Sequence, residues 1–128
     1  MASGSHPIAV LGAGSWGTAL AILIARRNQP VLLWDHNAEH VEALEKERRN
    51  TRYLPNFELT DHITPTADLS SLTTQTCNFV IAVPSHAFRT TLNALRQVLP
   101  ELDHDCRFCW GTKGLEATSG KLLNEVFD

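Results

Sequence analysis

The sequence lacks an excess of charge of either sign. Eleven Lys and Arg residues stand against 14 Asp and Glu residues in 128 positions, so the formal net charge is −3. Nucleic-acid binding needs a concentrated basic surface, and here the basic residues are scattered among acids, which argues against DNA or RNA as a partner. With 43% hydrophobic and 20% charged residues, the composition predicts one soluble globular domain rather than a disordered or fibrous chain.

Cysteine is also scarce. The three cysteines, Cys77, Cys106 and Cys109, are an odd number in a domain of ordinary size, which favours reduced thiols over a disulfide framework. Cys106 and Cys109 form a C-x-x-C, but no second pair of Cys or His accompanies them at ligand spacing. Their segment is typical of a strand, in which residues three apart point to opposite faces. We therefore expect buried strand cysteines and no metal site.

The chain shows no signal peptide and no convincing membrane span. Residues 8–25 carry no charge over a length that could pass for a membrane segment. However, no Lys or Arg precedes this stretch, three glycines interrupt its first half, and two arginines follow it. We therefore expect a cytoplasmic protein without membrane insertion.

The spacing of apolar residues predicts alternating strands and helices. Short apolar runs, typical of strands buried on both faces, occupy residues 7–11, 31–34, 78–83 and 107–112. Helices are expected at residues 15–27, 38–49, 67–74 and 85–99, and from about 119 to 128. The segment 50–65 contains two prolines and is expected to be a loop with one edge strand at 62–64. This alternation predicts an α/β fold with a mostly parallel, doubly wound sheet.

A glycine-rich hexapeptide, GAGSWG at residues 12–17, is the strongest local signal. It follows the first predicted strand, opens the first predicted helix, and has an acid, Asp35, 23 residues after Gly12 at the end of the second strand. Gly12 permits a tight turn, Gly14 lets a pyrophosphate approach the backbone, and Gly17 lets the helix pack closely on the strand. Amides at the start of the helix can then hold a diphosphate. The context predicts a dinucleotide-binding turn.

Two residues after the second strand bear on which dinucleotide binds. Asp35 would accept hydrogen bonds from the adenosine ribose hydroxyls, which favours NAD and would repel the additional phosphate of NADP. His36 beside it could stack on adenine or lie against a 2′-phosphate, so the choice between NAD and NADP stays open. The other four histidines that follow no partner pattern are expected at the surface: His6, His40, His62 and His104.

Five short motifs resemble one enzyme family. They are GAGSWGTALA (12–21), LW (33–34), NTRYLP (50–55), VPSHAFR (83–89) and WGTKGLE (110–116). In this order and spacing they resemble the amino-terminal domain of bacterial NAD(P)-dependent glycerol-3-phosphate dehydrogenase, over nearly the whole chain. The resemblance implies a Rossmann-type fold. It also implies reduction of dihydroxyacetone phosphate to sn-glycerol 3-phosphate with NADH or NADPH, for phospholipid synthesis.

The resemblance also implies roles for particular residues. Ser15 and Trp16 would line the pyrophosphate and ribose, His36 would face the adenosine end, and Tyr53 would lie near the cofactor. Lys113 matches the lysine that contacts both cofactor and substrate. Its position agrees, because it falls just past the carboxyl end of a predicted parallel strand, where doubly wound sheets bind ligands. A fixed ammonium there can polarise a substrate oxygen or hold a phosphate.

A further strand end carries Pro84, Ser85 and His86. These residues are candidates to line the cofactor groove, and we assign Pro84 to cofactor binding. Ser85 has a sufficient explanation as a helix cap. No partner for His86 can be argued from the sequence, so it is left out of the catalytic residues.

The chain departs from the family in length. The family has two domains and is well over twice as long, and the general-acid lysine and the groups that grip the substrate phosphate belong to its second, helical domain. We therefore expect residues 1–128 to be the NAD(P)-binding domain, truncated at its C-terminal end. We expect it to bind a dinucleotide weakly or not at all and to have no measurable dehydrogenase activity.

Other functions and one further consequence follow from the sequence. The chain could be the nucleotide domain of a related two-domain dehydrogenase, acting on 6-phosphogluconate or a hydroxyacyl thioester, although NTRYLP and TKGLE argue against this. It could instead be a non-catalytic NAD(P)-binding sensor or regulatory module. If the strand order is 3-2-1-4-5 with a sixth strand missing, the strand at 107–112 becomes an open edge, which predicts possible self-association.

Overall fold

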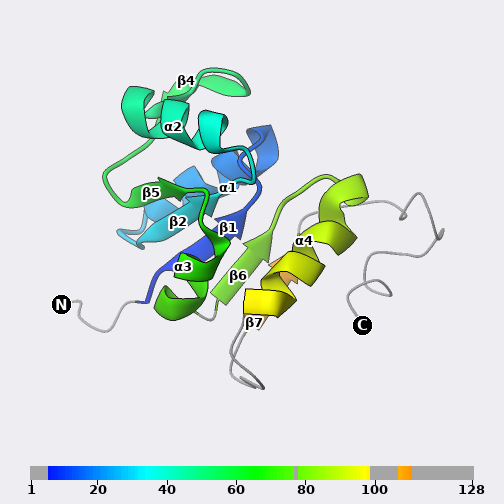
Figure 1. Cartoon of the computed structure of the whole chain (residues 1–128). Coiled ribbons are helices and arrows are strands. Elements are labelled where there is room, and N and C mark those ends of the chain that lie inside the picture. Colours follow the sequence, from blue (N-terminus) through cyan, green and yellow to red (C-terminus); the bar gives the residue numbers. More distant parts are fainter. Residues whose placement is uncertain (1–5, 77, 99–106, 111–128) are drawn as a thin grey trace.

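A central parallel sheet organises the molecule. The computed structural model describes residues 6–76, 78–98 and 107–110. Five strands pair in the order β5-β2-β1-β6-β7, and every pair is parallel (Figure 1). Their bounds are β1 Ile8–Leu11, β2 Val31–Trp34, β5 Ile63–Thr66, β6 Asn78–Ile81 and β7 Arg107–Trp110. The predicted doubly wound arrangement and its strand order are confirmed.

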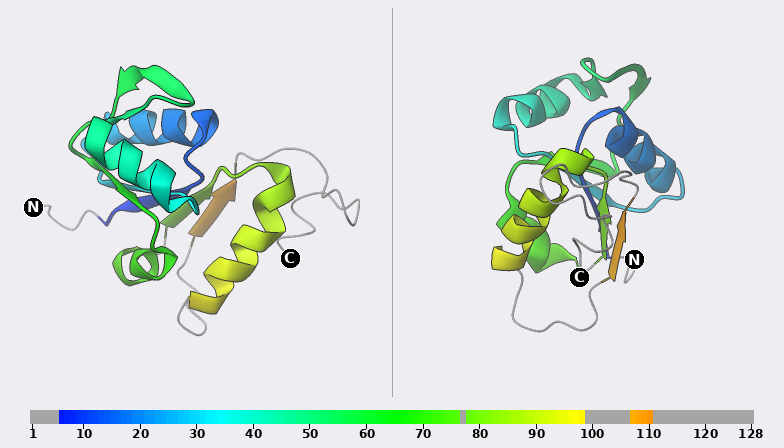
Figure 2. Two further views of the ribbon diagram at one scale, coloured as in Figure 1. Left: turned by 45° about the horizontal axis from the view of Figure 1, so that its top comes forward. Right: turned by 90° about the vertical axis from the view of Figure 1, so that its right-hand side faces the viewer.

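Helices cover both faces of the sheet. They are α1 Ser15–Ala25, α2 Ala38–Glu47, α3 Leu69–Gln75 and α4 Ser85–Val98. Helices α1 and α2 lie on one face, and α3 and α4 lie on the other (Figure 2). The chain therefore forms a three-layer α/β domain in which the inner strands β1 and β2 are buried between the two layers of helices.

Alternation along the strands divides the core into two layers. Ala9 and Leu11 of β1 pack toward α3 and α4, whereas Val10 packs toward α1 and α2, and all three are 0% exposed. Strand β2 behaves in the same way and is buried at every position. Strands buried on both faces show a continuous apolar run instead of a polar alternation, which is why their positions could be predicted.

Local signals set the ends of the helices. The Asn37 side chain caps α2, because its Oδ1 accepts hydrogen bonds from the amides of Glu39 (3.0 Å) and His40 (3.2 Å). Arg48, with a left-handed φ of 54°, ends α2 earlier than predicted. Asp68 caps α3, which begins at Leu69 and not at residue 67 as predicted, because the Asp68 Oδ1 accepts a hydrogen bond from the Ser70 amide.

The segment 50–65 contains more structure than predicted. The expected edge strand is present as β5. In addition, β3 (Arg49–Asn50) and β4 (Leu54–Glu58) pair antiparallel to form a separate two-stranded sheet. The prediction of a loop was wrong here because most of β4 is exposed and lacks apolar alternation, so backbone pairing alone defines it.

Two expectations about burial were also wrong. His40 is buried, at 9% exposed, because it faces the glycine turn from the first turn of α2. Cys109 is exposed, because α1 and α2 lie over β1, β2 and β5 rather than over β7. Several predicted features lie outside the described residues: Cys77, Cys106, His104, Leu99, the end of the strand at 111–112 and the helix at 119–128.

The described residues contain neither a helix that could cross a membrane nor a cluster of metal-binding side chains. No helix within these ranges has both the length and the apolar character that a membrane crossing requires. Nor do three or more His, Cys, Asp or Glu side chains gather there in a group that could hold a metal ion.

Candidate functional site

Three loops meet at the carboxyl edge of the sheet. Strands β1, β2 and β6 end side by side, with Leu11 in register with Trp34 on one side and with Ile81 on the other. The Gly12 amide donates to the Trp34 carbonyl (2.7 Å), and the Ala82 amide donates to the Leu11 carbonyl (2.8 Å). The turn after β1 is therefore fixed between the loops that follow β2 and β6, at the position where doubly wound sheets bind ligands.

Gly12 and Gly17 are required by close packing of the backbone. Gly12 has φ +112°, and a Cβ built on it would lie 2.9 Å from the Ala82 carbonyl carbon. A Cβ on Gly17 would lie 1.7 Å from the Gly12 carbonyl oxygen. No side chain fits in either place, so α1 rests directly on the turn, as the motif predicts.

Gly14 differs from the other two glycines. Its φ of −81° is open to any residue, and a Cβ built on it would meet no atom within 4 Å. A side chain at this position would therefore project into open space above the turn. Because Gly14 has no side chain, that space stays free for a ligand that approaches the backbone.

The start of α1 offers free hydrogen-bond donors. Gly14 caps the helix without any side-chain hydrogen bond, and the first turn contains no acidic residue. The first intrahelical bond joins the Thr18 amide to the Gly14 carbonyl, while the amides of residues 14–17 donate to no other described residue. Free amides at the positive end of a helix, below an open space, fit the diphosphate of a dinucleotide.

Asp35 links the glycine turn to the start of α2. Its Oδ1 accepts a hydrogen bond from the Ala13 amide (3.0 Å), and its Oδ2 accepts one from the Asn37 amide (3.1 Å). The side chain is only 15% exposed. The carboxylate that the sequence assigned to the ribose thus also holds the backbone of the turn, a role that the motif alone does not reveal.

His36 stands beside Asp35 at the surface. Its side chain is 83% exposed, and its Nδ1 lies 3.8 Å from Asp35 Oδ2. The imidazole therefore sits at the rim of the site, on the β2 side, where it can reach a ligand that extends past Asp35.

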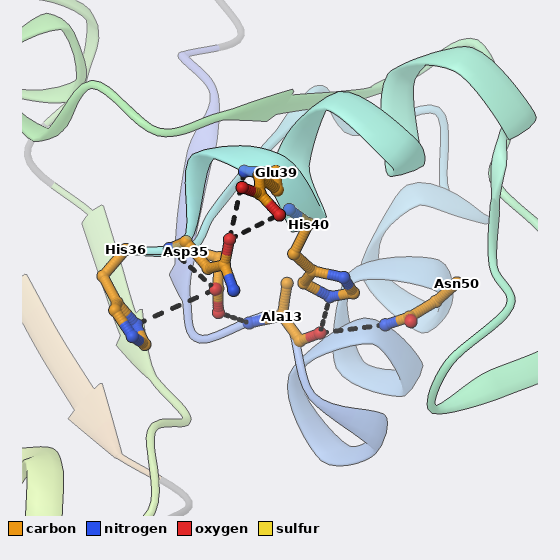
Figure 3. A network of polar contacts seen from close by, with 7 residues as sticks. Ala13, Asp35, His36, Glu39, His40 and Asn50 are labelled. Atoms are coloured by element: carbon orange, nitrogen blue, oxygen red, sulfur yellow. Dashed lines mark hydrogen bonds and ion pairs between the residues drawn. The ribbon is translucent and has the colours of Figure 1, made fainter.

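Sequence reasoning missed a buried polar cluster behind the turn. His40 Nε2 lies 2.8 Å from the Ala13 carbonyl oxygen, and Asn50 Nδ2 donates to the same oxygen at 2.9 Å (Figure 3). Asn50 Nδ2 also donates to Thr18 Oγ1 at 2.7 Å, and both of these residues are 0% exposed. The only sequence signal was the membership of Asn50 in NTRYLP, since polar side chains leave no trace in an apolar periodicity.

Tyr53 lies against this cluster. Its amide donates to Asn50 Oδ1 (3.2 Å), and its ring meets the His40 ring edge-on with centroids 5.4 Å apart. The Arg52 guanidinium carbon lies 5.4 Å from the Tyr53 ring centroid. The phenol is 45% exposed, so the cluster anchors a partly exposed aromatic ring close to the glycine turn.

The remaining predicted residues are placed as follows. Ser15 and Trp16 lie in the first turn of α1 and are exposed, Trp16 at 52%. Pro84 is exposed in the loop after β6, beyond Ala82 and Val83, which the turn contacts. Lys113 lies outside the described residues.

Comparison with known proteins points to the same enzyme family as the sequence motifs. The family model described as the N-terminus of NAD-dependent glycerol-3-phosphate dehydrogenase matches residues 7–128. The glycerol-3-phosphate dehydrogenase (NAD(P)+) of Methylococcus capsulatus is 50% identical over 122 residues, which cover 94% of this chain and 36% of that protein. The enzyme of the same name from Psychromonas ingrahamii is 44% identical over 119 residues, covering 93% and 35% respectively.

Solved structures extend the similarity to the fold. The crystal structure of glycerol-3-phosphate dehydrogenase from Coxiella burnetii superposes with a TM-score of 0.88 at 41% identity, covering 96% of this chain and 37% of that one. The yeast glycerol-3-phosphate dehydrogenase GPD1 superposes with a TM-score of 0.78 at 22% identity, which shows a shared fold. The chain thus spans about a third of the length of the curated relatives that it matches.

Proposed function

The chain belongs to the family of the N-terminal domain of NAD-dependent glycerol-3-phosphate dehydrogenase, and from this premise we propose that residues 1–128 form the dinucleotide-binding domain of such an enzyme. The observation that carries the proposal is the glycine turn, where open space above Gly14 lies over amides that donate to no other described residue. The reaction proposed for the whole enzyme is reduction of dihydroxyacetone phosphate to sn-glycerol 3-phosphate.

The described residues suggest how the dinucleotide is held. The amides of residues 14–17 would bind the diphosphate, with help from the α1 dipole. Asp35 and His36 lie on the side of β2, where they would meet the adenosine, and Pro84 lies on the side of β6. Tyr53 would supply an aromatic surface. When bound, NADH or NADPH supplies the hydride, and the chain's residues orient it.

Lys113 is proposed to act on the substrate side. It follows β7, which runs parallel to β6 and therefore ends at the same edge of the sheet as the glycine turn. An ammonium group at that edge would attract the substrate phosphate or stabilise negative charge that develops on the carbonyl oxygen. The general acid and the main phosphate-binding groups would come from the part of the enzyme that this chain does not span.

Two other functions remain alternatives. Relatives that are 50% and 44% identical bear the name glycerol-3-phosphate dehydrogenase, which supports that substrate over 6-phosphogluconate or a hydroxyacyl thioester. A sensor or regulatory module would use the same turn but would bind the dinucleotide tightly without a second domain.

A cytoplasmic location is also part of the proposal and is supported by the free thiol of Cys109.

Calorimetric titration of the chain with NADH and with NADPH tests the proposal. We expect saturable but weak binding, because only one wall of the cofactor cleft is present in residues 1–128. The ratio of the two affinities decides between NAD and NADP. Tight binding accompanied by a conformational response would favour the sensor, and complete absence of binding to a folded chain would overturn dinucleotide binding by this domain alone.

A further inference from the structure

Buried or partly buried side chains hold both the N–H and the C=O group of Ala13. The Ala13 amide donates to Asp35, and the Ala13 carbonyl accepts from both His40 and Asn50. A carbonyl with two side-chain donors has both of its lone pairs used. The backbone is thus fixed in orientation at the residue that precedes Gly14.

This arrangement determines where the Gly14 amide points. The Ala13 carbonyl and the Gly14 N–H belong to one planar peptide unit, and the described residues contain no cis peptide bond. In a trans peptide these two groups point in opposite directions. Because His40 and Asn50 hold the carbonyl toward the interior, they direct the Gly14 N–H away from these buried side chains.

Asn50 has the hydrogen-bonding capacity to do this firmly. Its two amide hydrogens go to the Ala13 carbonyl and to Thr18 Oγ1, and its Oδ1 accepts from the Tyr53 amide. The Ala13 carbonyl requires a donor and the Tyr53 N–H requires an acceptor. Only one of the two orientations of the Asn50 side-chain amide satisfies both partners. Asn50 therefore joins the turn, the first helix and the Tyr53 segment through a single buried side chain that is 0% exposed.

We propose that Asn50 and His40 are positioning residues for the dinucleotide: by holding the Ala13 carbonyl they aim the Gly14 amide at the diphosphate. This inference rests on the proposed function. It assigns a role in cofactor binding to two residues that are not themselves expected to contact the cofactor. Preorganised donors bind an anion without having to be ordered first, so loosening the turn weakens binding while the contacting atoms stay unchanged.

The first test removes the donors from Asn50. Asn50→Leu substitutes an apolar side chain of similar size, which cannot bind the Ala13 carbonyl. The matched control is Thr76→Val, which removes a buried hydroxyl that donates to the Pro7 carbonyl at the opposite end of β1. Of the three hydrogen bonds that Asn50→Leu loses, we attribute the effect on the turn to the one with the Ala13 carbonyl, and we expect NADH binding to weaken by about three- to tenfold. We expect Thr76→Val to leave NADH binding unchanged.

The second test uses His40, which is 9% exposed, whereas Asn50 is 0% exposed. His40→Leu removes one donor to the Ala13 carbonyl, and His40→Gln keeps a side-chain N–H for it. We expect His40→Leu to lower NADH affinity and His40→Gln to restore most of it. In the absence of NADH, NMR order parameters should show greater mobility of Gly14 in His40→Leu than in wild type, and no change in Thr76→Val.

The outcomes separate the two proposals. Wild-type chain that is folded but binds no NADH overturns dinucleotide binding by this domain alone, and with it the positioning role. Wild-type binding together with unchanged affinity and unchanged Gly14 order parameters in folded His40→Leu or Asn50→Leu overturns only the positioning role. An equal loss of affinity in Thr76→Val would show a general effect of stability and would also overturn it.

Discussion

At the residue scale, the three glycines of the turn meet different physical requirements. Gly12 and Gly17 are fixed by backbone atoms that a Cβ would strike, whereas Gly14 has an ordinary φ and open space around it. A glycine motif therefore combines a folding requirement with a binding requirement, and the two can be separated by substitution.

Alanine substitution should separate them. Gly17→Ala places a Cβ 1.7 Å from the Gly12 carbonyl, which we expect to lower the free energy of unfolding by about 1–3 kcal/mol or more, despite the better helix propensity of alanine. Gly14→Ala should leave stability within about 0.5 kcal/mol of wild type but abolish NADH binding. Urea unfolding followed by NADH titration measures both. Normal NADH binding by Gly14→Ala would contradict the assignment of the open space to the ligand.

The polar residues behind the turn show the limit of reasoning from sequence at this scale. Asp35 was found through its spacing from Gly12, since the motif fixes that distance along the chain. His40 was placed wrongly at the surface, and Asn50 had no assigned role. Their importance depends on which side chains helix α2 and strand β3 bring against the turn, and no local pattern in the sequence encodes those contacts.

At the element scale, burial explains which elements could be predicted. Strands β1, β2 and β6 are apolar runs because helices cover both of their faces. Helix α4 shows its buried stripe through Phe88, Leu92 and Leu95. Strand β4 lies mostly exposed and contains a proline, so the apolar pattern that identified the other strands is missing from it.

The cap of α3 carries a pH-dependent interaction. The Ser70 hydroxyl, together with backbone amides, hydrogen-bonds the Asp68 carboxylate and lowers its pKa below the ordinary value of 3.8. A carboxyl whose pKa is lower in the folded state stabilises the fold above its unfolded pKa. That contribution is lost as the pH falls below about 3.8 and through the folded pKa.

An NMR titration of the Asp68 carboxyl tests this cause. We expect its pKa to rise in Ser70→Ala, because the hydroxyl is the largest contributor to the lowered value. Ser71→Ala is the matched control, since the Ser71 hydroxyl donates to the Asp68 backbone carbonyl rather than to the carboxylate. A pKa that stays the same in Ser70→Ala, or that rises equally in both variants, would contradict the assignment.

At the scale of the whole molecule, the chain provides one side of a proposed two-domain cleft. Holding both reactants in a reactive geometry is worth about 7–11 kcal/mol, and residues 1–128 offer only the dinucleotide side of such an arrangement. We therefore expect no oxidation of NADH or NADPH that depends on dihydroxyacetone phosphate. A steady-state absorbance assay checks this, and turnover clearly above the rate without protein would contradict it.

The two edges of the described sheet differ in how well they resist pairing. Strand β5 contains Pro65, which lacks an amide hydrogen, whereas β7 contains no proline and pairs only with β6 among the described strands. We propose that the chain self-associates through β7. Sedimentation should show association that increases with concentration, and Cys109→Lys, which adds a charge at an exposed position of this edge, should reduce it. A wild-type monomer at high concentration would count against the proposal.

The central claim is that the turn at residues 12–17 binds the diphosphate of NAD(P)H, and mapping of backbone amides by NMR during titration with NADH tests it most directly. The account predicts that the largest shifts occur at the amides of residues 14–17, with smaller shifts at Asp35 and His36, and that Gly14→Ala abolishes them. Shifts confined to another surface, such as the groove that Glu42, Glu45 and Asp68 line between α2 and β5, would contradict it.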